Sequence, residues 1–376
     1  MGSYNEKNAN VRDRAAGRGG TMEVRQEIGR RLRVEMDRKG LLAPDLVDLA
    51  RLSPDCISGY LHGRKEILFR ELEPICSALN IPIMRLLTQS DPSPARIAYR
   101  KTLQADRKTV AKSENVFLWI EEFLPRFRSP SVPLPNIGAT TDAQMLIAEV
   151  KGFIDRLKSR NPSLEYWYET LGIALAGSRQ EGRTSIAQKP DGLCLSDNEH
   201  TLVLVNTDCP DVRLQFTLLH ELWHAICDRG RDVPADHLPR EFYDEALSED
   251  ARPEFCANKF AQFWTIPFET AEGLARKMNR LSGLTQQDVE EALQDTGGSP
   301  EVLGNAVYDA LRYMGGRQKT FASIRDEIRT LAVNWSGNQS TRIFVASETR
   351  KLRETLQTQR EVFGDHAWAA IESVIS

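Results

Sequence analysis

Two histidines, His220 and His224, stand four residues apart inside an almost unbroken apolar stretch of the chain. The stretch reads Phe216-Thr217-Leu218-Leu219-His220-Glu221-Leu222-Trp223-His224-Ala225. An apolar segment of this kind predicts a largely buried helix, and on a helix two side chains four residues apart share one face. A solvated helix with two incidental histidines would not carry so many apolar residues, and buried imidazoles need polar partners. The spacing therefore predicts a metal site.

Glu221 follows His220 directly and lies about 100° further round the helix. It can therefore reach a water molecule on the metal without binding the metal itself. A catalytic zinc ion usually takes three protein ligands and leaves a further position for water. A third histidine at the spacing His-x-x-Gly-x-x-His is excluded, because Cys227 and Gly230 occupy the relevant positions. The remaining candidates downstream are His237, Glu241, Asp244, Glu245, Glu249, Asp250 and Glu254.

Glu254 differs from the other candidates because it stands at the start of a predicted helix, whereas the others lie mostly in a polar stretch typical of a loop. Pro253 precedes it as a helix-opening residue, and an amphipathic pattern continues through Trp264. A carboxylate on a helix packed against the first helix is held more firmly than one on a loop. Asn258 is one turn further along the same face and is predicted to hydrogen-bond to the metal site. The ordinary alternative for Glu254 is a first-turn glutamate that interacts with the helix dipole.

Two short motifs in this region resemble the ImmA/IrrE family of zinc metallopeptidases. The family has a Thr-x-x-His-Glu-x-x-His helix, matched by Thr217–His224, and then a Glu-x-x-Ala-Asn-x-Phe-Ala helix, matched by Glu254–Ala261. The second helix usually closes on a hydrophobic residue and a proline, which here are Ile266 and Pro267. The resemblance covers approximately residues 140–270.

This resemblance implies that His220, His224 and Glu254 bind zinc and that Glu221 is the catalytic base. Trp223 stands where the family commonly has glycine, which adds bulk to the helix but replaces no ligand. A structural zinc site is the less favoured interpretation, because such sites usually fill every position, most often with cysteine. The candidates for stabilising an oxyanion lie in the following rim loop and are His237, Arg240 and Tyr243.

Residues 22–90 are predicted to form a bundle of short helices, after a polar tail at residues 1–21. The helical patterns cover residues 24–39, 43–52, 54–61, 68–79 and 82–87. Ser53 stands at an N-cap position and Pro54 at the first helical position, which is the layout of a helix-turn-helix. The region resembles the phage-repressor (XRE) type of DNA-binding domain. The matching residues are Gly40-Leu41, Ile57-Ser58, Gly63-Arg64-Lys65 and Ala78-Leu79-Asn80-Ile81-Pro82.

DNA binding through residues 22–90 is what this second resemblance implies. The candidate contacts are Ser53, Asp55, Ser58, Arg64 and Lys65. Asp55 would face phosphates unfavourably unless it reads a cytosine amino group. Phosphate neutralisation therefore falls to Arg64, Lys65 and His62, with Arg30, Arg31 and Arg33 as further candidates. The glutamine that the family places at the start of its first motif helix is Ala43 here. The alternative is a helix-turn-helix fold retained as a protein-docking module.

The rest of the chain divides by its pattern into three regions. Residues 91–135 are predicted to be a connecting helix that ends in the Pro-rich linker Ser129–Pro135. Residues 136–275 form the predicted ImmA/IrrE-like metallopeptidase domain, and residues 276–376 show helical patterns without a functional motif. Within the peptidase-like domain the patterns predict helices at 144–157 and 164–176 and strands at 185–195 and 201–206. We therefore expect a mostly α fold with a small β-sheet: an N-terminal helix-turn-helix bundle, a central α+β zincin-like domain and a C-terminal helical region.

The composition is that of a globular protein, with 41% hydrophobic and 27% charged residues and a net charge of −4. Apolar runs stay shorter than the ~18 residues that span a membrane, and the first residues lack the apolar core of a signal peptide. The six cysteines show no pairing rhythm, which is typical of free thiols in a reducing cytoplasm. The sequence predicts a cytoplasmic protein without a membrane partner.

These observations predict a zinc-dependent metallo-endopeptidase linked to a DNA-binding domain. The ImmA/IrrE resemblance implies that its protein substrate is a helix-turn-helix repressor, cut to control transcription in a stress or mobile-element response. The alternative is an XRE-family transcriptional regulator or antitoxin-like DNA-binding protein, in which the peptidase-like domain is a sensor or scaffold. The sequence leaves open the oligomeric state, a dimer included, the substrate and its cleavage site, the operator and the inducing signal.

Overall fold

The computed structural model describes residues 25–36, 39, 41–79, 81, 86, 96–100, 107–137, 140, 142–178, 191–197, 199–229, 251–280, 283–315, 320–333, 335 and 340–375. The chain forms two compact units, Met1–Ser93 and Pro94–Ser376. As predicted, it is mostly helical with a small β-sheet. In the described part of the chain no helix combines the length and the apolar character needed to cross a membrane.

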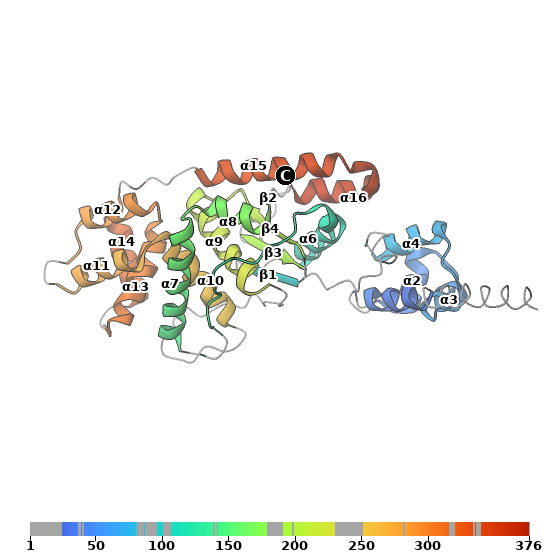
Figure 1. Ribbon diagram of the computed structural model, residues 1–376, viewed down its shortest axis with the longest axis horizontal. Helices are drawn as coiled ribbons and strands as arrows, with labels where there is room; N and C mark the ends of the chain where they lie inside the picture. Colours follow the sequence, from blue (N-terminus) through green and yellow to red (C-terminus); the bar gives the residue numbers. More distant parts are fainter. Residues whose placement is uncertain are drawn as a thin grey trace, which may run out of the picture. The chain divides into compact units, whose positions relative to one another are not determined.

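The first unit is a bundle of short helices around its own apolar core (Figure 1). The helix at residues 25–36 is followed by α2 (Ala43–Ala50), α3 (Pro54–Leu61) and α4 (Phe69–Leu79). Ser53 caps α3 by accepting a hydrogen bond from the Cys56 amide at 3.2 Å, and Pro54 opens the helix, as the sequence predicts. The core contains Leu32, Leu46, Ile57, Tyr60, Ile75 and Leu79. Of the predicted helix at 82–87, only residue 86 lies among the described residues.

The second unit contains a mixed four-stranded sheet in the order β1-β3-β4-β2. Its strands are β1 (Arg96–Arg100), β2 (Ala174–Ser178), β3 (Gly192–Ser196) and β4 (Thr201–Asn206). β3 pairs antiparallel with both β1 and β4, and β2 pairs parallel with β4. The predicted hairpin is therefore present as β3 and β4, whereas the sequence patterns place β1 and the start of β2 in helical segments.

The two extra strands have different explanations. The predicted helix at 164–176 ends early, because α8 (Leu164–Leu171) is closed by Gly172 in the left-handed conformation, with φ 66°. The chain then enters β2. The β1 segment carries a five-residue pattern too short to separate strand from helix by periodicity. Its identity as a strand comes from pairing with β3, a partner nearly a hundred residues further on.

Helices pack on this sheet and bring the predicted metal-binding segments together. α9 (Asp211–Cys227) contacts β1, β3 and β4, and α10 (Arg252–Thr265) packs against α9 and against α7 (Ala143–Arg160). Trp223 of α9 is fully buried and meets the rings of Phe153 and Phe260, with centroid separations of 6.0 and 5.5 Å. These rings fix the spacing of the three helices, because interiors of this kind are close-packed. The bulk at Trp223 is therefore core packing.

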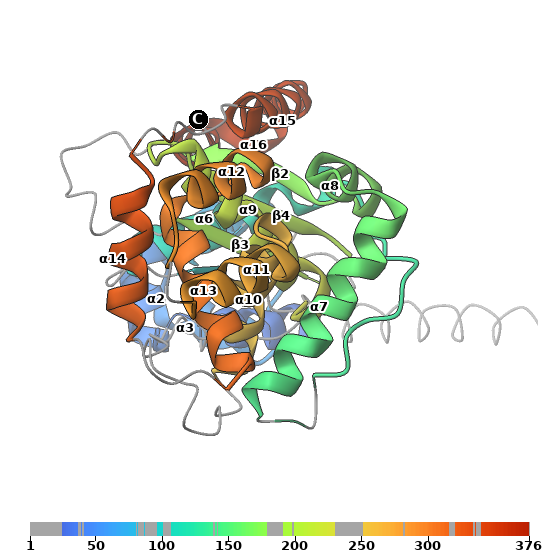
Figure 2. The ribbon, with the colours of Figure 1, turned by 90° about the vertical axis from the view of Figure 1, so that its left-hand side faces the viewer.

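The remaining helices belong to the same unit as the metal-binding segments. They are α6 (Arg107–Ile120), the short η1 (Glu121–Phe123), α11 (Phe268–Met278), α12 (Gln286–Thr296), α13 (Pro300–Tyr313), α14 (Phe321–Leu331), α15 (Ser340–Gln357) and α16 (Arg360–Val374). α13 packs against α10, and α15 packs against β2 and α9. The paired α15 and α16 lie along one side of this unit in both views (Figures 1 and 2). The division of the chain falls at Ser93–Pro94, and Val132 of the Pro-rich stretch is buried in the second unit's core.

A buried ion pair joins α10 to α13, one of the C-terminal helices. The Lys259 ammonium donates to the Asp309 carboxylate of α13, and the Gln262 side chain donates to the same Oδ2 atom at 2.6 Å. Burial lowers the pKa of Lys259 to about 7 and raises the pKa of Asp309 well above its ordinary value. Burial thus disfavours the charged form of each group, and the contact between the two side chains is what compensates for it.

We expect Asp309→Ala to lower the free energy of unfolding by about 3–5 kcal/mol, because it leaves Lys259 buried without its counter-charge. Glu301→Ala is the matched control on the same helix, since Glu301 is half-exposed and pairs with Arg329 only at 3.6 Å. That variant should change stability by less than about 1 kcal/mol. Urea denaturation of the full chain measures both, and equal effects of the two variants would contradict the account.

Candidate metal centre

Three buried side chains from α9 and α10 face one another. One ligand atom from each of His220, His224 and Glu254 can be chosen so that all lie within 4.8 Å of one another. The Nε2 atoms of the two histidines are 3.0 Å apart. Glu254 Oε2 is 3.3 Å from His220 Nε2, and Glu254 Oε1 is 3.3 Å from His224 Nε2. This group could hold a metal ion, as the sequence predicts for these residues.

The spacing of these atoms fits a cation at their centre. A tetrahedral ion with bonds of about 2.0–2.2 Å separates its ligand atoms by about 3.3–3.6 Å. The observed separations of 3.0 and 3.3 Å are close to that range. Two imidazole nitrogens and a carboxylate form a donor set that zinc accepts. Lone pairs pointed at one another among buried side chains repel, so a shared positive charge is the physical reason for such an arrangement.

Asp228 orients His224 from the other side of the ring. The His224 Nδ1 atom lies 2.9 Å from Asp228 Oδ2, and both side chains are fully buried. A carboxylate at this position accepts the Nδ1 proton and leaves the Nε2 lone pair directed at Glu254 and His220. Asp228 follows the last residue of α9, so the end of the helix supplies the group that fixes its own histidine.

The electrostatics of the cluster favour positive charge among the rings. Burial by itself lowers the pKa of His224, but hydrogen bonds to Asp228 and Glu254 outweigh it and hold that pKa well above its ordinary value. Burial likewise acts to raise the pKa of Glu254, but the charge and hydrogen bonds of His220 and His224 outweigh it and hold that pKa far below the usual range. A divalent cation satisfies the same preference.

The Glu221 carboxylate lies against the beginning of β3. It is completely buried, and a Cβ atom placed on Gly192 of β3 would lie 2.7 Å from Glu221 Oε1 and 2.6 Å from the Thr217 methyl carbon. Burial, reinforced by the negative charge of Glu221, raises the pKa values of Tyr168 and Cys194 well above their ordinary values. The Glu221 carboxylate is therefore held between α9 and the beginning of β3, beside the metal-binding residues and outside the ligand set.

Other predicted site residues are placed differently. Asn258 is half-buried on α10, and within the described residues its side chain makes no hydrogen bond to the cluster, so its predicted role stays a prediction. The alternative third ligands at 237–250 and the rim-loop residues Arg240 and Tyr243 lie outside the described residues. Asp228 is not among the residues predicted from the sequence, because the segment after His224 has the pattern of a loop. Its position four residues after His224, at the end of the same helix, is the signal that identifies it.

The candidate DNA contacts belong to the first unit. Ser53, Asp55, Ser58, Arg64 and Lys65 are all exposed. The Lys65 ammonium lies 2.8 Å from the Cys56 sulfur, and this contact lowers the pKa of the Cys56 thiol and raises the pKa of Lys65. The structure thus leaves these side chains on the surface along and after α3, without bringing them into a closed site.

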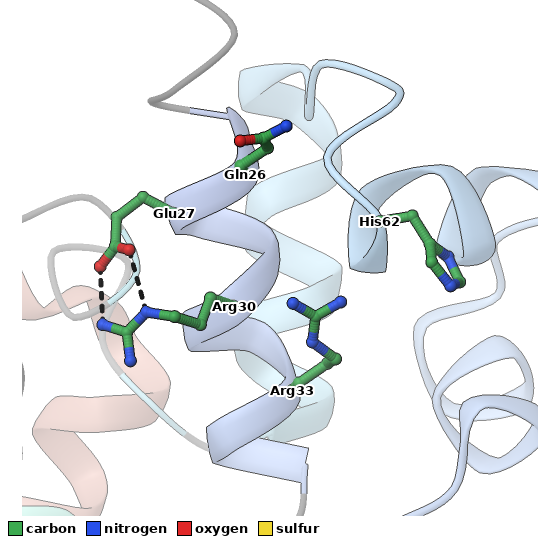
Figure 3. A pocket seen from close by; sticks show the side chains of 5 residues that line it. All are labelled: Gln26, Glu27, Arg30, Arg33 and His62. Atoms are coloured by element: carbon green, nitrogen blue, oxygen red, sulfur yellow. Dashed lines mark hydrogen bonds and ion pairs between the residues drawn. The ribbon is translucent and has the colours of Figure 1, made fainter.

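A pocket of about 450 Å³ also belongs to the first unit (Figure 3). Its lining residues are Gln26, Glu27, Arg30, Arg33 and His62. Figure 3 shows the Glu27 carboxylate bound by Arg30, at 2.9 and 2.8 Å, and this pair lowers the pKa of Glu27 to about 2 although burial opposes the shift. Arg33 donates to the Leu61 carbonyl. Two arginines thus stand beside α3, and Glu27 offsets the charge of Arg30.

Comparison of the chain with models of protein families gives no match, and comparisons with curated proteins and with solved structures give none either. The assignment of the site therefore depends on its motifs and on the geometry described above.

Removal of Asp228 should weaken metal binding without removing a ligand. We expect Asp228→Ala to lower zinc affinity by about 10–100-fold, because His224 loses the partner that orients its ring. Competition with a chromophoric chelator measures this affinity. Asn258→Ala, measured in parallel, tests the role predicted for that residue. Unchanged affinity in Asp228→Ala would show that His224 does not need this carboxylate.

Gly192→Ala tests the close contact between β3 and α9. The added methyl would meet Glu221 and Thr217 at distances that real Cβ atoms do not reach, so a strand or helix must shift. We expect a loss of about 1–3 kcal/mol in the free energy of unfolding. Gly273→Ala on the exposed face of α11, where a Cβ meets nothing within 4 Å, is the control and should be neutral or stabilising. A neutral Gly192→Ala variant would contradict the predicted crowding.

Proposed function

We propose that the chain is a zinc-dependent metallo-endopeptidase linked to a helix-turn-helix domain. The observation that carries this proposal is the buried group of His220, His224 and Glu254, with Glu221 held next to it against the start of β3. The set supplies two imidazoles and one carboxylate, and this number of protein ligands is typical of a catalytic zinc site, which leaves a position for water. A purely structural site would be closed by further ligands, usually cysteines.

In this proposal each residue has a distinct task. His220, His224 and Glu254 would hold the ion, and Asp228 would keep His224 in the tautomer that binds it. The chemistry that zinc supplies in such a site is polarisation of the scissile carbonyl and a pKa of about 7 for a bound water. Glu221 would take the proton from the attacking water and pass it to the leaving amine. Its burial beside the ligands, without membership of the ligand group, supports this role.

The proposed substrate is a helix-turn-helix repressor, either a separate protein or the N-terminal part of this chain. The first unit supports the proposal because it packs as a helical bundle with an N-capped α3 after a tight turn. Covalent linkage raises the effective concentration of any repressor docked on that unit near the peptidase. Cutting such a repressor would release the genes that it silences, in a stress or mobile-element response.

Glu221→Gln and Glu254→Ala separate catalysis from metal binding. Glutamine has the same shape but accepts no proton near neutral pH, so Glu221→Gln should keep zinc and lose at least about 100-fold in hydrolysis. Glu254→Ala should lose both zinc and hydrolysis, because it removes one of the three proposed ligands. The measurements are metal content and mass spectrometry of repressor fragments after co-expression with repressors encoded beside the gene, with and without DNA damage. Loss of zinc in Glu221→Gln, or full zinc in Glu254→Ala, would contradict the roles assigned.

A second candidate is an XRE-type regulator or antitoxin-like protein in which the metal domain is a sensor or scaffold. The observation that favours it is the exposure of Arg64 and Lys65 at and beyond the end of α3, together with the arginines of the neighbouring pocket. Such a protein would bind DNA through phosphate contacts and weaken steeply with salt. Salt-sensitive operator binding that persists in Glu221→Gln, combined with no Glu221-dependent fragments, would select this candidate over the peptidase.

A further inference from the structure

β1 occupies an edge position in the sheet, beside the strand that touches Glu221. The register pairs Arg96 with Ser196 and Arg100 with Gly192, in antiparallel orientation. β3 is hydrogen-bonded to β4 on its other side, so β1 takes the one edge of β3 that would otherwise be open. An extended peptide that joins a sheet needs an edge of this kind, because its backbone is held by the free N–H and C=O groups of the outer strand.

The register brings β1 close to the catalytic carboxylate. Directly opposed residues of antiparallel strands have Cα atoms about 4.5–5.5 Å apart. Arg100 is opposite Gly192, and Gly192 is the position at which an added Cβ would lie 2.7 Å from Glu221 Oε1. β1 also contacts α9 directly. The backbone of β1 therefore runs past the beginning of β3 at the level of Glu221.

The opposite edge of the sheet is also covered. β2 is the outer strand there, and α15 packs on it, with the Gly177 amide donating to Thr349 Oγ1 at 2.7 Å. Thr349 is itself buried. A peptide strand therefore cannot pair with β2, because α15 packs on that strand. On the β3 side, the position next to β3 is taken by β1, a five-residue strand at the end of the sheet.

We propose that β1 lies in the position of a substrate strand and holds the peptidase in an autoinhibited state, so that a substrate must replace residues 96–100 on β3. This inference rests on the proposed peptidase function. β1 begins three residues after Ser93, where the first unit ends, so an event on that unit can withdraw the strand through the chain itself. The substrate class is then an extended segment that pairs antiparallel with Gly192–Ser196.

An engineered cross-strand disulfide would lock β1 in place. The register sets Ala98 opposite Cys194, a free and buried cysteine. The separation of opposed residues, about 4.5–5.5 Å, lies inside the range of about 4.4–6.8 Å that a disulfide accepts. Ala98→Cys in the full chain should therefore oxidise, so that the introduced thiol forms a disulfide with Cys194 that dithiothreitol reverses. Ala98→Ser, and Ala98→Cys combined with Cys194→Ala, are the controls that cannot form it.

The opposite variant releases the strand. Replacing residues 96–100 by Gly-Ser-Gly-Ser-Gly in the full chain removes the β-forming side chains and keeps the length. The readout is zinc-dependent hydrolysis of fluorescein-labelled casein, an unfolded protein. An enzyme whose open state is a minor population of 0.1–10% gains about tenfold or more when that state becomes dominant. We expect such a gain for the replaced strand, and a loss of about tenfold or more, restored by reduction, for the locked strand.

The proposal is wrong if the oxidised Ala98→Cys variant, the same variant after reduction and the Gly-Ser replacement hydrolyse casein at the same rate. It is also wrong if Ala98→Cys does not form the disulfide. Amide hydrogen exchange at residues 192–196 is the readout that does not depend on catalysis. Release of β1 should speed exchange of the β3 amides that face it, and locking should slow it. If exchange at residues 192–196 changes as expected but no variant shows hydrolysis that depends on Glu221, both the autoinhibition and the peptidase function are wrong. Unchanged exchange together with normal hydrolysis overturns the β1 assignment alone.

Discussion

The structure depends on burying two imidazoles and a carboxylate in the interface between α9 and α10. His220 and His224 are 0% and 1% exposed, and Glu254 is 6% exposed. Each of these groups is costly to bury alone, at several kcal/mol for a charged side chain, so they are stable only as a set with a shared counter-charge. The surrounding side chains keep the three groups together. Trp223 and Phe260 set the distance between the helices, and Asp228 fixes the orientation of one ring.

The cluster of His220, His224 and Glu254 is predictable from sequence because each part of it is encoded locally. His220 and His224 share a face through helical periodicity, and Glu254 follows a helix-opening proline. The hairpin of β3 and β4 and most helices are also local patterns. Asp228 is less visible, because the sequence does not show that α9 ends one residue before it. β1 and β2 depend on pairing between distant segments, and no periodicity within five residues specifies that pairing.

The second unit also connects the candidate metal centre to helices whose sequences carry no functional motif. α13 is fastened to α10 by Lys259 and Asp309, within two turns of Glu254. α15 covers β2 and contacts α9, while α16 packs on α6. The C-terminal helices are thus part of the body that positions the ligands, which gives residues 276–376 a structural role that the sequence did not indicate. The same body includes the Pro-rich stretch, so the division between units falls before β1.

We propose that His220, His224 and Glu254 together bind one zinc ion. X-ray absorption at the zinc edge, recorded on the full chain loaded with one equivalent of zinc, tests it most directly. The account predicts only nitrogen and oxygen neighbours, at about 2.0–2.2 Å, including the outer-shell scattering that imidazole rings give. Cys194 and Cys256 are buried in the same core as the cluster, so sulfur ligation is the competing result. A sulfur neighbour at about 2.3 Å would contradict the proposed ligand set.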